Sequence, residues 1–497
     1  MSTEVRNLTP IKLWNHFADL NAVPRPSKKE ERVVQFIIDF AKKLQLEHTT
    51  DNIGNVIVKK PATKGLENRK KVVLQSHLDM VHQKNNDTIF NFDTQGIEMY
   101  IKEGWVTANG TTLGADNGIG VAAIMAVLSS KDIAHPALEA LFTVDEETGM
   151  TGALGLQPNM LEGEILLNLD TEEDNEIGIG CAGGIDITAS KNYIEEETPK
   201  NNTAFTIKIK GLQGGHSGME IHKGLANANK LMNSILYALH NSVDLKISSI
   251  LGGNLRNAIP RESITTFTIP ERDKTTLKQT AKEVINKLKS EYLKIEPNFS
   301  VEILETELPK KILNSTFQHT LLLALDSAIN GVFKMHPSIN NLVETSNNIS
   351  KVVVCNGNAL IECLARSSSE SGKQDITNTL EACFKLANFT VSLSREYPGW
   401  QPNLQSEIVK KMTAIYKDLF NRTPNIAVCH AGLECGILSK KYPNIDMVSF
   451  GPTIKGAHSP DESVSITSTQ KFWKFFIETL KNIPEKETKS IFLKKDT

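Results

Sequence analysis

Apolar runs that end on a histidine or an acid recur three times between residues 72 and 170 of this chain. Each run is short and aliphatic, which predicts a buried strand of a parallel sheet. In open α/β sheets, ligands bind beyond the carboxyl ends of the strands, so the polar side chains at these ends are expected to gather at one site. The runs are Val72–Leu74, followed by His77 and Asp79; Ala137–Val144, followed by Asp145, Glu146 and Glu147; and Ile165–Leu169, followed by Asp170.

The first run brings an imidazole and a carboxylate close together. If the strand continues past Leu74, His77 and Asp79 face the same side, because side chains along a strand repeat every second residue. An acid beside a histidine suits a metal ligand whose second ring nitrogen is held by that acid. The alternative is an ordinary exposed H-x-D at a strand end, and two residues alone do not decide between the two roles.

The second run ends on three consecutive acids at residues 145–147. Neighbouring carboxylates repel one another unless a cation or solvent compensates their charge, which favours a metal site here. Glu146 and Glu147 are adjacent in what reads as an extended segment. Their side chains are therefore expected to diverge, so that one can bind a metal while the other faces a water molecule.

A glycine-rich turn, TTLGADNGIG at residues 111–120, leads into a predicted apolar helix that extends to about Ser129. Asp116 lies where the turn enters the helix, so its carboxylate is expected at an end of the sheet. The alternative is that Asp116 or Asn117 is only the N-cap of the helix, a common role for these residue types.

The pattern of predicted elements divides the chain into three stretches. Residues 1–186 form the first part of an α/β domain, which begins with an amphipathic helix behind a capping box at residues 27–30. Residues 187–399 alternate strands with amphipathic helices, as expected of an inserted α+β domain. Residues 400–497 complete the first domain, and their loop GPTIKGAHSPDE presents His458. FTIKIKGLQGGHSG and ALIECLARSSSESG share a strand, a small-residue loop and a helix, which leaves an internal duplication open.

Composition excludes several classes of protein. A chain of 497 residues is too long for one core, so two or three domains are expected. The net charge of −3 gives no basic footprint, which argues against a nucleic-acid partner. No apolar run approaches the roughly 18–20 residues that cross a bilayer, and the start MSTEVRNLTPIKLW has no apolar signal segment, so we expect a cytoplasmic protein without a membrane partner. Six cysteines without a C-x-x-C pair indicate reduced thiols.

Five of the residues above supply two imidazoles and three carboxylates. Zinc ions prefer roughly four nitrogen and oxygen ligands, and a shared carboxylate can hold two ions about 3.5–4 Å apart. The set is sufficient for such a centre if Asp116 bridges. Its members are His77, Asp116, Glu147, Asp170 and His458.

Eight motifs stand in the order found in one known family. They are HLDMV, LGADNG, DEETGMTGA, NLDTEE, GGHSG, NAIP, HAGLECG and AHSPDE. From about residue 10 to 480 the chain thereby resembles the Xaa-His dipeptidases, within the larger two-zinc aminoacylase/carboxypeptidase metallopeptidase family. The resemblance implies an aminopeptidase-like α/β catalytic domain, with a mostly parallel mixed sheet flanked by helices, and an inserted α+β lid domain.

The resemblance also implies roles at the metal centre. Asp79 orients His77, and Glu146 is the general base that accepts a proton from water and passes it to the leaving amine. The implied ligands are His77, Asp116 and Asp170 for one divalent ion, and Asp116, Glu147 and His458 for the other.

Substrate-binding roles follow from the same resemblance. His216 in GGHSG is similar to a family residue that reaches the scissile carbonyl from the lid, although a solvent-exposed turn histidine is the alternative. Arg366 suits the substrate carboxylate because a guanidinium matches a carboxylate with two hydrogen bonds, and a surface ion pair is the competing view. The other candidates are Asn257, for a further hydrogen bond, and His430 and Glu434, for the amino end of the peptide.

The implied activity is metal-dependent hydrolysis of dipeptides, including Xaa-His types such as carnosine. The same ligands would serve a deacylase or an aminotripeptidase, whereas a non-catalytic binding protein on this fold is expected to have lost Glu146 or a ligand. Zinc is the expected metal, and cobalt or manganese accept similar ligands. A homodimer formed through the lid is expected, with a monomer that has a duplicated lid as the alternative.

Overall fold

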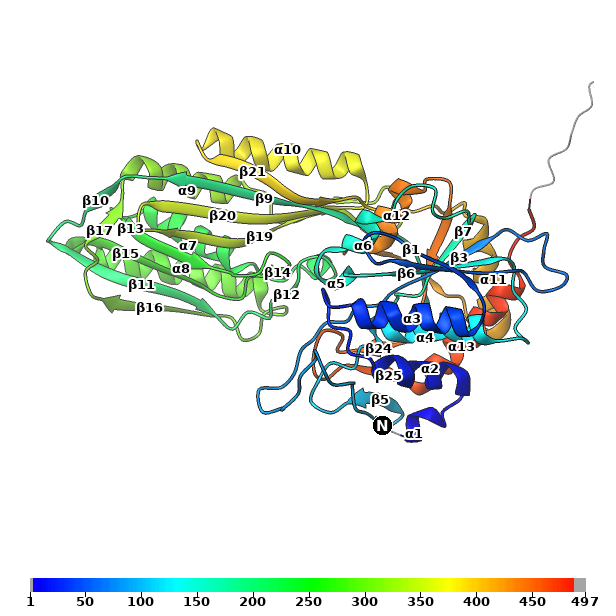
Figure 1. Ribbon diagram of the computed structural model, residues 1–497. Helices are drawn as coiled ribbons and strands as arrows, with labels where there is room; N and C mark the ends of the chain where they lie inside the picture. The colour runs from blue at the N-terminus through cyan, green and yellow to red at the C-terminus, as the bar shows by residue number, and fades with distance from the viewer. Residues whose placement is uncertain (1–2, 487–497) are drawn as a thin grey trace, which may run out of the picture. The chain divides into compact units, whose positions relative to one another are not determined.

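The computed structural model describes residues 3–486, which form two compact units (Figure 1). The first unit contains the chain up to Gly180, Pro402–Val428 and the chain from Glu434, and the second contains Cys181–Gln401 and Cys429–Leu433. Each unit has its own core of buried apolar side chains. The predicted fold class, an α/β domain interrupted by an α+β insertion, is confirmed. The role of the insertion as a lid stays a prediction.

The first unit is built on an eight-stranded mixed sheet with the order β1-β2-β6-β3-β7-β23-β8-β22. The neighbours β6, β3, β7 and β23 run parallel, and β1, β2 and β8 run antiparallel to their neighbours. Every residue of β3, β6 and β7 is buried, as expected of parallel strands covered on both faces. The strands are β1 Glu47–Thr50, β2 Val56–Lys60, β3 Val72–His77, β6 Leu138–Thr143, β7 Ile165–Asn168, β8 Glu176–Cys181, β22 Asn425–Cys429 and β23 Asp446–Ser449.

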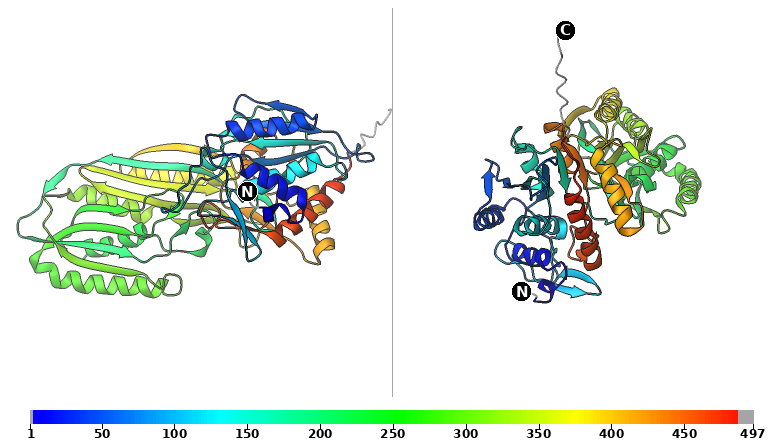
Figure 2. Two further views of the ribbon diagram at one scale, coloured as in Figure 1. Left: turned by 60° about the horizontal axis from the view of Figure 1, so that its bottom comes forward. Right: turned by 90° about the vertical axis from the view of Figure 1, so that its right-hand side faces the viewer.

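Helices from both ends of the sequence cover this sheet. The helix α4 (Ala115–Ser129) is apolar on all sides because it packs against both β3 and α2 (Ile11–Asn21). Figure 2 shows the red helix α13 (Ile466–Lys481) beside the orange helix α11 (Glu407–Phe420), which it contacts. The C-terminal part of the chain therefore completes the first core. The remaining helices of this unit are α1 Thr3–Arg6, α3 Glu31–Lys43, α5 Glu146–Gly149, α6 Thr151–Gly155 and α12 Glu434–Lys441.

A smaller four-stranded sheet with the order β24-β25-β5-β4 also belongs to the first unit. It joins a hairpin from the first part of the chain to a hairpin from the last part, because β25 pairs with β5. Its strands are β4 Met99–Lys102, β5 Trp105–Ala108, β24 Ile454–Lys455 and β25 Ser463–Ser465.

The predicted capping box at residues 27–30 is wrong. The helix α3 begins at Glu31, and no side chain caps its N-terminus. Lys28 has a left-handed φ of 69°, which turns the chain between the two ends of the predicted box. Ser27 Oγ donates instead to Asp79 Oδ2 at 2.8 Å, and Glu30 Oε1 accepts the backbone N–H of Lys28 at 2.6 Å.

The second unit contains a nine-stranded antiparallel sheet with the order β16-β11-β15-β13-β19-β20-β9-β21, to which β18 is added beside β19. Buried and partly exposed residues alternate along β11, as expected of a sheet with one face on the core. The strands are β9 Gly183–Asn192, β11 Asn202–Lys210, β13 Lys246–Gly252, β15 Ser263–Pro270, β16 Ser300–Thr306, β18 Gly331–Met335, β19 Val343–Cys355, β20 Asn358–Ser367 and β21 Thr390–Tyr397; the helices are α7 Ala228–His240, α8 Lys274–Tyr292, α9 Ser315–Ser327 and α10 Glu370–Leu386.

Two short ladders complete this unit. One pairs β12 with β14, and the other pairs β10 with β17. Across residues 3–486, no helix is both long and apolar enough to cross a membrane. The strands of these ladders are β10 Glu195–Glu197, β12 Gly215–His216, β14 Ala258–Ile259 and β17 Lys311–Leu313.

Candidate metal centre

His77 is the last residue of β3, and both of its ring nitrogens face carboxylates. Nδ1 lies 3.4 Å from Asp79 Oδ1, and Nε2 lies 3.2 Å from Asp116 Oδ1. The strand does not continue to Asp79 as the same-face argument requires, because β3 ends at His77. Asp79 is nevertheless fully buried beside the ring, where its Oδ1 accepts the backbone N–H of Glu146 at 3.0 Å. This bond ties the end of β3 to the turn that follows β6.

Asp116 lies between two histidines. Its Oδ1 is 3.2 Å from His77 Nε2, and its Oδ2 is 3.2 Å from His458 Nε2. Asp170 Oδ1 approaches the first histidine at 3.4 Å, and Glu147 Oε2 approaches the second at 3.0 Å. One carboxylate thus faces two sets of candidate ligands, and within each set the ligand atoms lie within 4.8 Å of one another.

The N-cap alternative for Asp116 and Asn117 does not describe this turn. Gly114 occupies the N-cap position of α4 with a left-handed φ of 70°, and a glycine has no side chain to cap the helix. Both Asp116 and Asn117 have non-helical backbone angles. Asn117 Nδ2 donates to Leu169 O at 2.8 Å and to the Asp170 carboxylate, so it fixes a neighbouring member of the cluster.

The predicted extended conformation of residues 145–147 is wrong. Asp145 has a left-handed φ of 52°, and the next four residues form the short helix α5. The hydroxyls of Thr148 and Thr151 donate to the Asp145 carboxylate and hold this turn. Glu146 and Glu147 therefore converge, since one carboxylate oxygen of each lies within 4.8 Å of a His77 ring nitrogen.

The acids of this cluster are costly to ionise together. Burial raises the pKa of Asp170 to about 6 and raises the pKa of Glu146 well above its usual range. Burial disfavours the charged form of His77, but the Asp170 and Asp116 carboxylates outweigh it and raise the pKa of the imidazole. A bound cation would stabilise the ionised form of these buried carboxylates.

The donor set fits divalent metal ions. Imidazole nitrogens and carboxylate oxygens suit zinc, and similar sets accept cobalt or manganese. Glu147 Oε1 is buried and has no hydrogen-bond partner within residues 3–486, which leaves a free lone pair in the cluster. Two three-residue sets that share one carboxylate match the general arrangement of a two-metal hydrolytic site.

Glu434, the first residue of α12, is buried in the first unit. Gln75 Nε2 on β3 and Thr143 Oγ1 on β6 each donate to its Oε2 at 2.6 Å. Its Oε1 is buried and has no partner in the described part of the chain. Burial raises the pKa of Glu434 to about 7, and the charges of His77 and Asp170 also act on it.

The other four predicted site residues lie in the second unit, and three of them surround Gly218. A Cβ atom added to Gly218 would lie 2.2 Å from His430 O, 3.1 Å from Arg366 Nε and 3.1 Å from His216 Cε1. His216 Nδ1 accepts the backbone N–H groups of Gly218 and Met219 at 3.2 and 3.0 Å, so the neutral ring carries its hydrogen on Nε2.

Arg366 and His430 each retain a buried nitrogen that has no partner among residues 3–486. For Arg366 this atom is Nε, since Nη1 donates to Tyr397 Oη at 2.8 Å. For His430 it is Nδ1, since Nε2 bonds with Ser346 Oγ at 2.8 Å. Burial, with a further contribution from the Arg366 charge, lowers the pKa of His430 to about 3, so the ring is neutral near pH 7. The two free nitrogens suit a polar or anionic ligand.

Asn257 lies in the turn that precedes β14. Because β14 pairs with β12, this turn is fixed beside the strand that carries His216. Asn348 Nδ2 also donates to the two backbone carbonyl oxygens that flank Asn257, at 3.2 and 2.8 Å. The backbone of Asn257 is therefore held by both the ladder and a buried side chain.

Sequence reasoning missed the buried residues that hold the metal cluster from behind. Arg25 donates to Leu78 O at 3.1 Å, to Asp79 O at 3.0 Å and to Gly114 O at 2.6 Å. Its sequence context, one arginine between two prolines, gives no signal for this role because these three partners are backbone carbonyls of distant segments, and the fourth, Asn21 Oδ1, lies outside the cluster. Glu462 was visible only as part of AHSPDE.

The chain belongs to the peptidase family M20/M25/M40, whose family model matches residues 73–482. The match includes all twelve candidate residues named from the sequence, from His77 to His458. The chain is therefore a metallopeptidase by family, and the acidic and histidine cluster of the first unit lies in the matched region.

Two relatives are similar over nearly their full length. The cytosol non-specific dipeptidase of Escherichia coli K12 is 44% identical over 484 residues, which cover 97% of this chain and 100% of the relative. The crystal structure of aminoacylhistidine dipeptidase from Vibrio alginolyticus is 43% identical, with a TM-score of 0.90 over 98% of this chain and 99% of that chain. The aminopeptidase PepT structure from Bacillus cereus, 16% identical with a TM-score of 0.56 over 96% of this chain and 99% of that chain, shares the fold.

Proposed function

We propose that this chain is a dipeptidase that works with two divalent metal ions. His77, Asp116 and Asp170 would hold one ion, and Asp116, Glu147 and His458 would hold the other. The observation that carries the proposal is the Asp116 carboxylate, whose two oxygens each lie 3.2 Å from a different histidine. The dipeptide class is supported by relatives that are 44% and 43% identical and that are named as dipeptidases.

The chain's own residues supply orientation and proton transfer. Bound divalent ions would lower the pKa of a water molecule and polarise the scissile carbonyl. Glu146 accepts the proton of that water on its carboxylate and delivers it to the leaving amine, a role that suits a carboxyl whose pKa is raised by burial. Asp79 Oδ1 lies 3.4 Å from His77 Nδ1 and so orients Nε2 of that ring toward the other carboxylates.

Substrate binding is assigned to five polar side chains, of which Glu434, Arg366 and His430 each have a buried polar atom without a partner in residues 3–486. Glu434 Oε1, buried and without a partner in the described chain, accepts the free amino group of the peptide. Arg366 binds the carboxylate end, because its guanidinium can donate more than one hydrogen bond to a carboxylate. His216 donates from Nε2 to the carbonyl oxygen on which negative charge develops. Asn257 and His430 provide further hydrogen bonds.

The metal, the cellular location and the oligomeric state are also proposals. Zinc is the proposed metal, with cobalt and manganese as workable substitutes. A cytoplasmic location agrees with the name of the Escherichia coli relative. A homodimer is proposed to form through the second unit. There, among the strands of residues 3–486, β18 pairs with β19 alone, and Val332, Phe333 and Met335 are 39–46% exposed. Its mass in solution, measured by light scattering, separates a dimer from a monomer.

The test of the proposed function is metal analysis of the purified protein combined with a substrate panel. The panel contains free dipeptides, carnosine, tripeptides and N-acetyl amino acids. We expect about two metal ions per chain and fastest turnover of free dipeptides. Faster turnover of N-acetyl amino acids would identify a deacylase, and faster turnover of tripeptides an aminotripeptidase. A fully metallated protein that cleaves nothing in the panel would be a binding protein, and the proposal would be wrong.

A matched variant examines the amino-group assignment. Glu434→Gln keeps the shape of the side chain and an acceptor for Gln75 and Thr143, but removes its negative charge. We expect the preference for a free dipeptide over its N-acetyl derivative to fall in this variant, because the acetyl derivative has no ammonium group to lose. An unchanged preference would remove Glu434 from the substrate site.

A further inference from the structure

The loop at residues 456–462, which we call the histidine loop, joins β24 to β25 and carries His458. Residues 455–463 are all described, and within them Glu462 is the single buried residue. The other side chains of this stretch are exposed or partly exposed, and His458 keeps 55% of its side-chain surface. An exposed loop has few packing contacts to hold a metal ligand in place. Its one buried side chain, Glu462, is therefore the side chain best placed to hold the loop.

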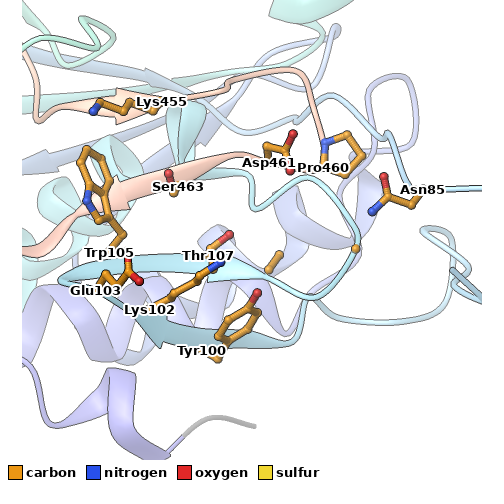
Figure 3. A pocket seen from close by; sticks show the side chains of 12 residues that line it. Asn85, Tyr100, Lys102, Glu103, Trp105, Thr107, Lys455, Pro460, Asp461 and Ser463 are labelled. Atoms are coloured by element: carbon orange, nitrogen blue, oxygen red, sulfur yellow. The ribbon is translucent and has the colours of Figure 1, made fainter.

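The histidine loop borders a pocket. The pocket has a volume of about 380 Å³, with Pro460 and Asp461 at one end and Trp105 and Lys455 at the other (Figure 3). Lys455 Nζ lies 4.8 Å from the centre of the Trp105 ring, at the end of the pocket away from Pro460 and Asp461. Pro460 and Asp461 therefore border open space on this side of the loop.

On its inner side the loop is held by the Glu462 carboxylate. Oε2 accepts the backbone N–H groups of Leu113 at 2.7 Å and Gly114 at 2.8 Å. Oε1 accepts those of Ala115 at 2.7 Å and Asp116 at 3.2 Å. Four successive N–H groups of the turn that leads into α4 thus converge on one buried carboxylate and stabilise its negative charge.

Arg25 holds the same turn from the opposite direction. Its guanidinium donates to Gly114 O at 2.6 Å and to Leu78 O and Asp79 O at 3.1 and 3.0 Å. The close approach needs a glycine, because a Cβ at Gly114 would lie 2.5 Å from Arg25 Nη2. Hydrogen bonds from Arg25 therefore link the turn that carries Asp116 to the segment that follows β3. The bonds accepted by Glu462 link the same turn to the histidine loop.

We propose that Glu462 is a positioning residue that sets the separation of His458 from Asp116 and thereby the affinity of the metal site formed by Asp116, Glu147 and His458. Glu462 belongs to neither of the two three-residue ligand sets that share Asp116. Its side chain bonds to the backbone of Asp116, the ligand shared by both sets, and belongs to the loop that carries His458. These two ligands are separated by more than 300 residues in sequence. This inference rests on the proposed function, since it concerns the second metal of that site.

The test compares Glu462→Gln with the matched control Asp461→Asn. The first variant replaces one accepting oxygen by an amide and removes the charge, whereas the second changes an exposed neighbour on the same loop that makes no side-chain bond to residues 113–116. Metal affinity is measured by competition with a chromophoric chelator. We expect one of the two ions to bind about 10–100-fold more weakly in Glu462→Gln, the usual effect of losing a partner behind a ligand, and no change in Asp461→Asn.

Two further measurements separate positioning from a general loss of structure. Amide hydrogen exchange should accelerate at residues 113–116 in Glu462→Gln while the β3 and β6 segments keep their protection. Turnover should return toward the wild-type value at saturating metal, which an unfolded or rearranged site would not allow. If Glu462→Gln does not fold, Glu462→Asp, which keeps the charge but shortens the side chain, should show the same changes at smaller size.

Unchanged metal affinity in a folded Glu462 variant would overturn the inference, as would equal weakening in Asp461→Asn. Failure of the proposed function looks different, because the wild-type protein itself would then bind fewer than two ions. The two ideas can therefore fail separately.

Discussion

Glu146 and Glu147 are adjacent, yet their positions suit different roles, one as proton acceptor and the other as metal ligand. A Glu→Gln substitution at each position should therefore differ in its effect on metal content. Glu146 belongs to neither three-residue set that shares Asp116, whereas Glu147 Oε2 lies 3.0 Å from His458 Nε2. The bond from the Glu146 backbone N–H to Asp79 Oδ1 is independent of its side chain, so Glu146→Gln keeps the turn intact. Only the proton acceptor is lost.

The expected magnitude follows from that single loss. A general base contributes about 10²–10⁴-fold, so Glu146→Gln should lower kcat by this factor, equivalent to about 2.7–5.4 kcal/mol, with metal content unchanged. Glu147→Gln should lose a metal ion and activity together, and added metal should restore part of the turnover. The assay is kcat on a free dipeptide beside metal analysis of the same samples. Near-normal turnover in Glu146→Gln, or equal metal loss in both variants, would refute this division of roles.

Two other outcomes are expected. Gly218→Ala would place a Cβ 2.2 Å from His430 O and 3.1 Å from Arg366 Nε, so KM for dipeptides should rise with little change in metal content, and an unchanged KM would separate these residues from substrate binding. Burial raises the pKa of Glu434 from an ordinary 4.5 to about 7 in the folded state, so the folded state binds this proton more tightly than the unfolded state. The free energy of unfolding therefore falls as the pH rises from 4.5 to 7, because the unfolded state loses the proton first. Metal-free Glu434→Gln should therefore gain stability relative to wild type across that window, by up to about 1.4 kcal/mol per pH unit in urea titrations, and a flat difference would contradict the assignment.

The strand-end pattern predicted much of the fold and the cluster because it is local. Aliphatic runs of parallel strands are readable in sequence, and the side chains that follow β3, β6 and β7 must meet at the carboxyl edge of the sheet. The structure brings His77 and Asp170 together in this way, at the ends of β3 and β7, and Asp116 joins them from the turn that leads into α4. The strand-end pattern alone does not predict where His458 lies, because its exposed loop is far in sequence from these strands.

Backbone reversals account for the local errors. A left-handed φ at Asp145 converted a predicted extended segment into the helical turn α5, and a left-handed φ at Lys28 removed the expected capping box. Neither residue is a glycine, the residue type that most often marks a left-handed turn, so neither turn was predicted. Glu462 escaped notice for another reason: its partners are four backbone N–H groups, which have no signature in the identity of residues 113–116.

The metal content of the purified protein and of Asp116→Ala, determined by mass spectrometry of the bound elements, decides whether one carboxylate serves two ions. The oxygens of Asp116 lie 3.2 Å from His77 Nε2 and from His458 Nε2, as a shared ligand requires. We predict about two ions per chain in the wild type, with loss of bound metal and of dipeptide hydrolysis together in Asp116→Ala. Two fully occupied ions in Asp116→Ala would contradict a shared ligand at this position.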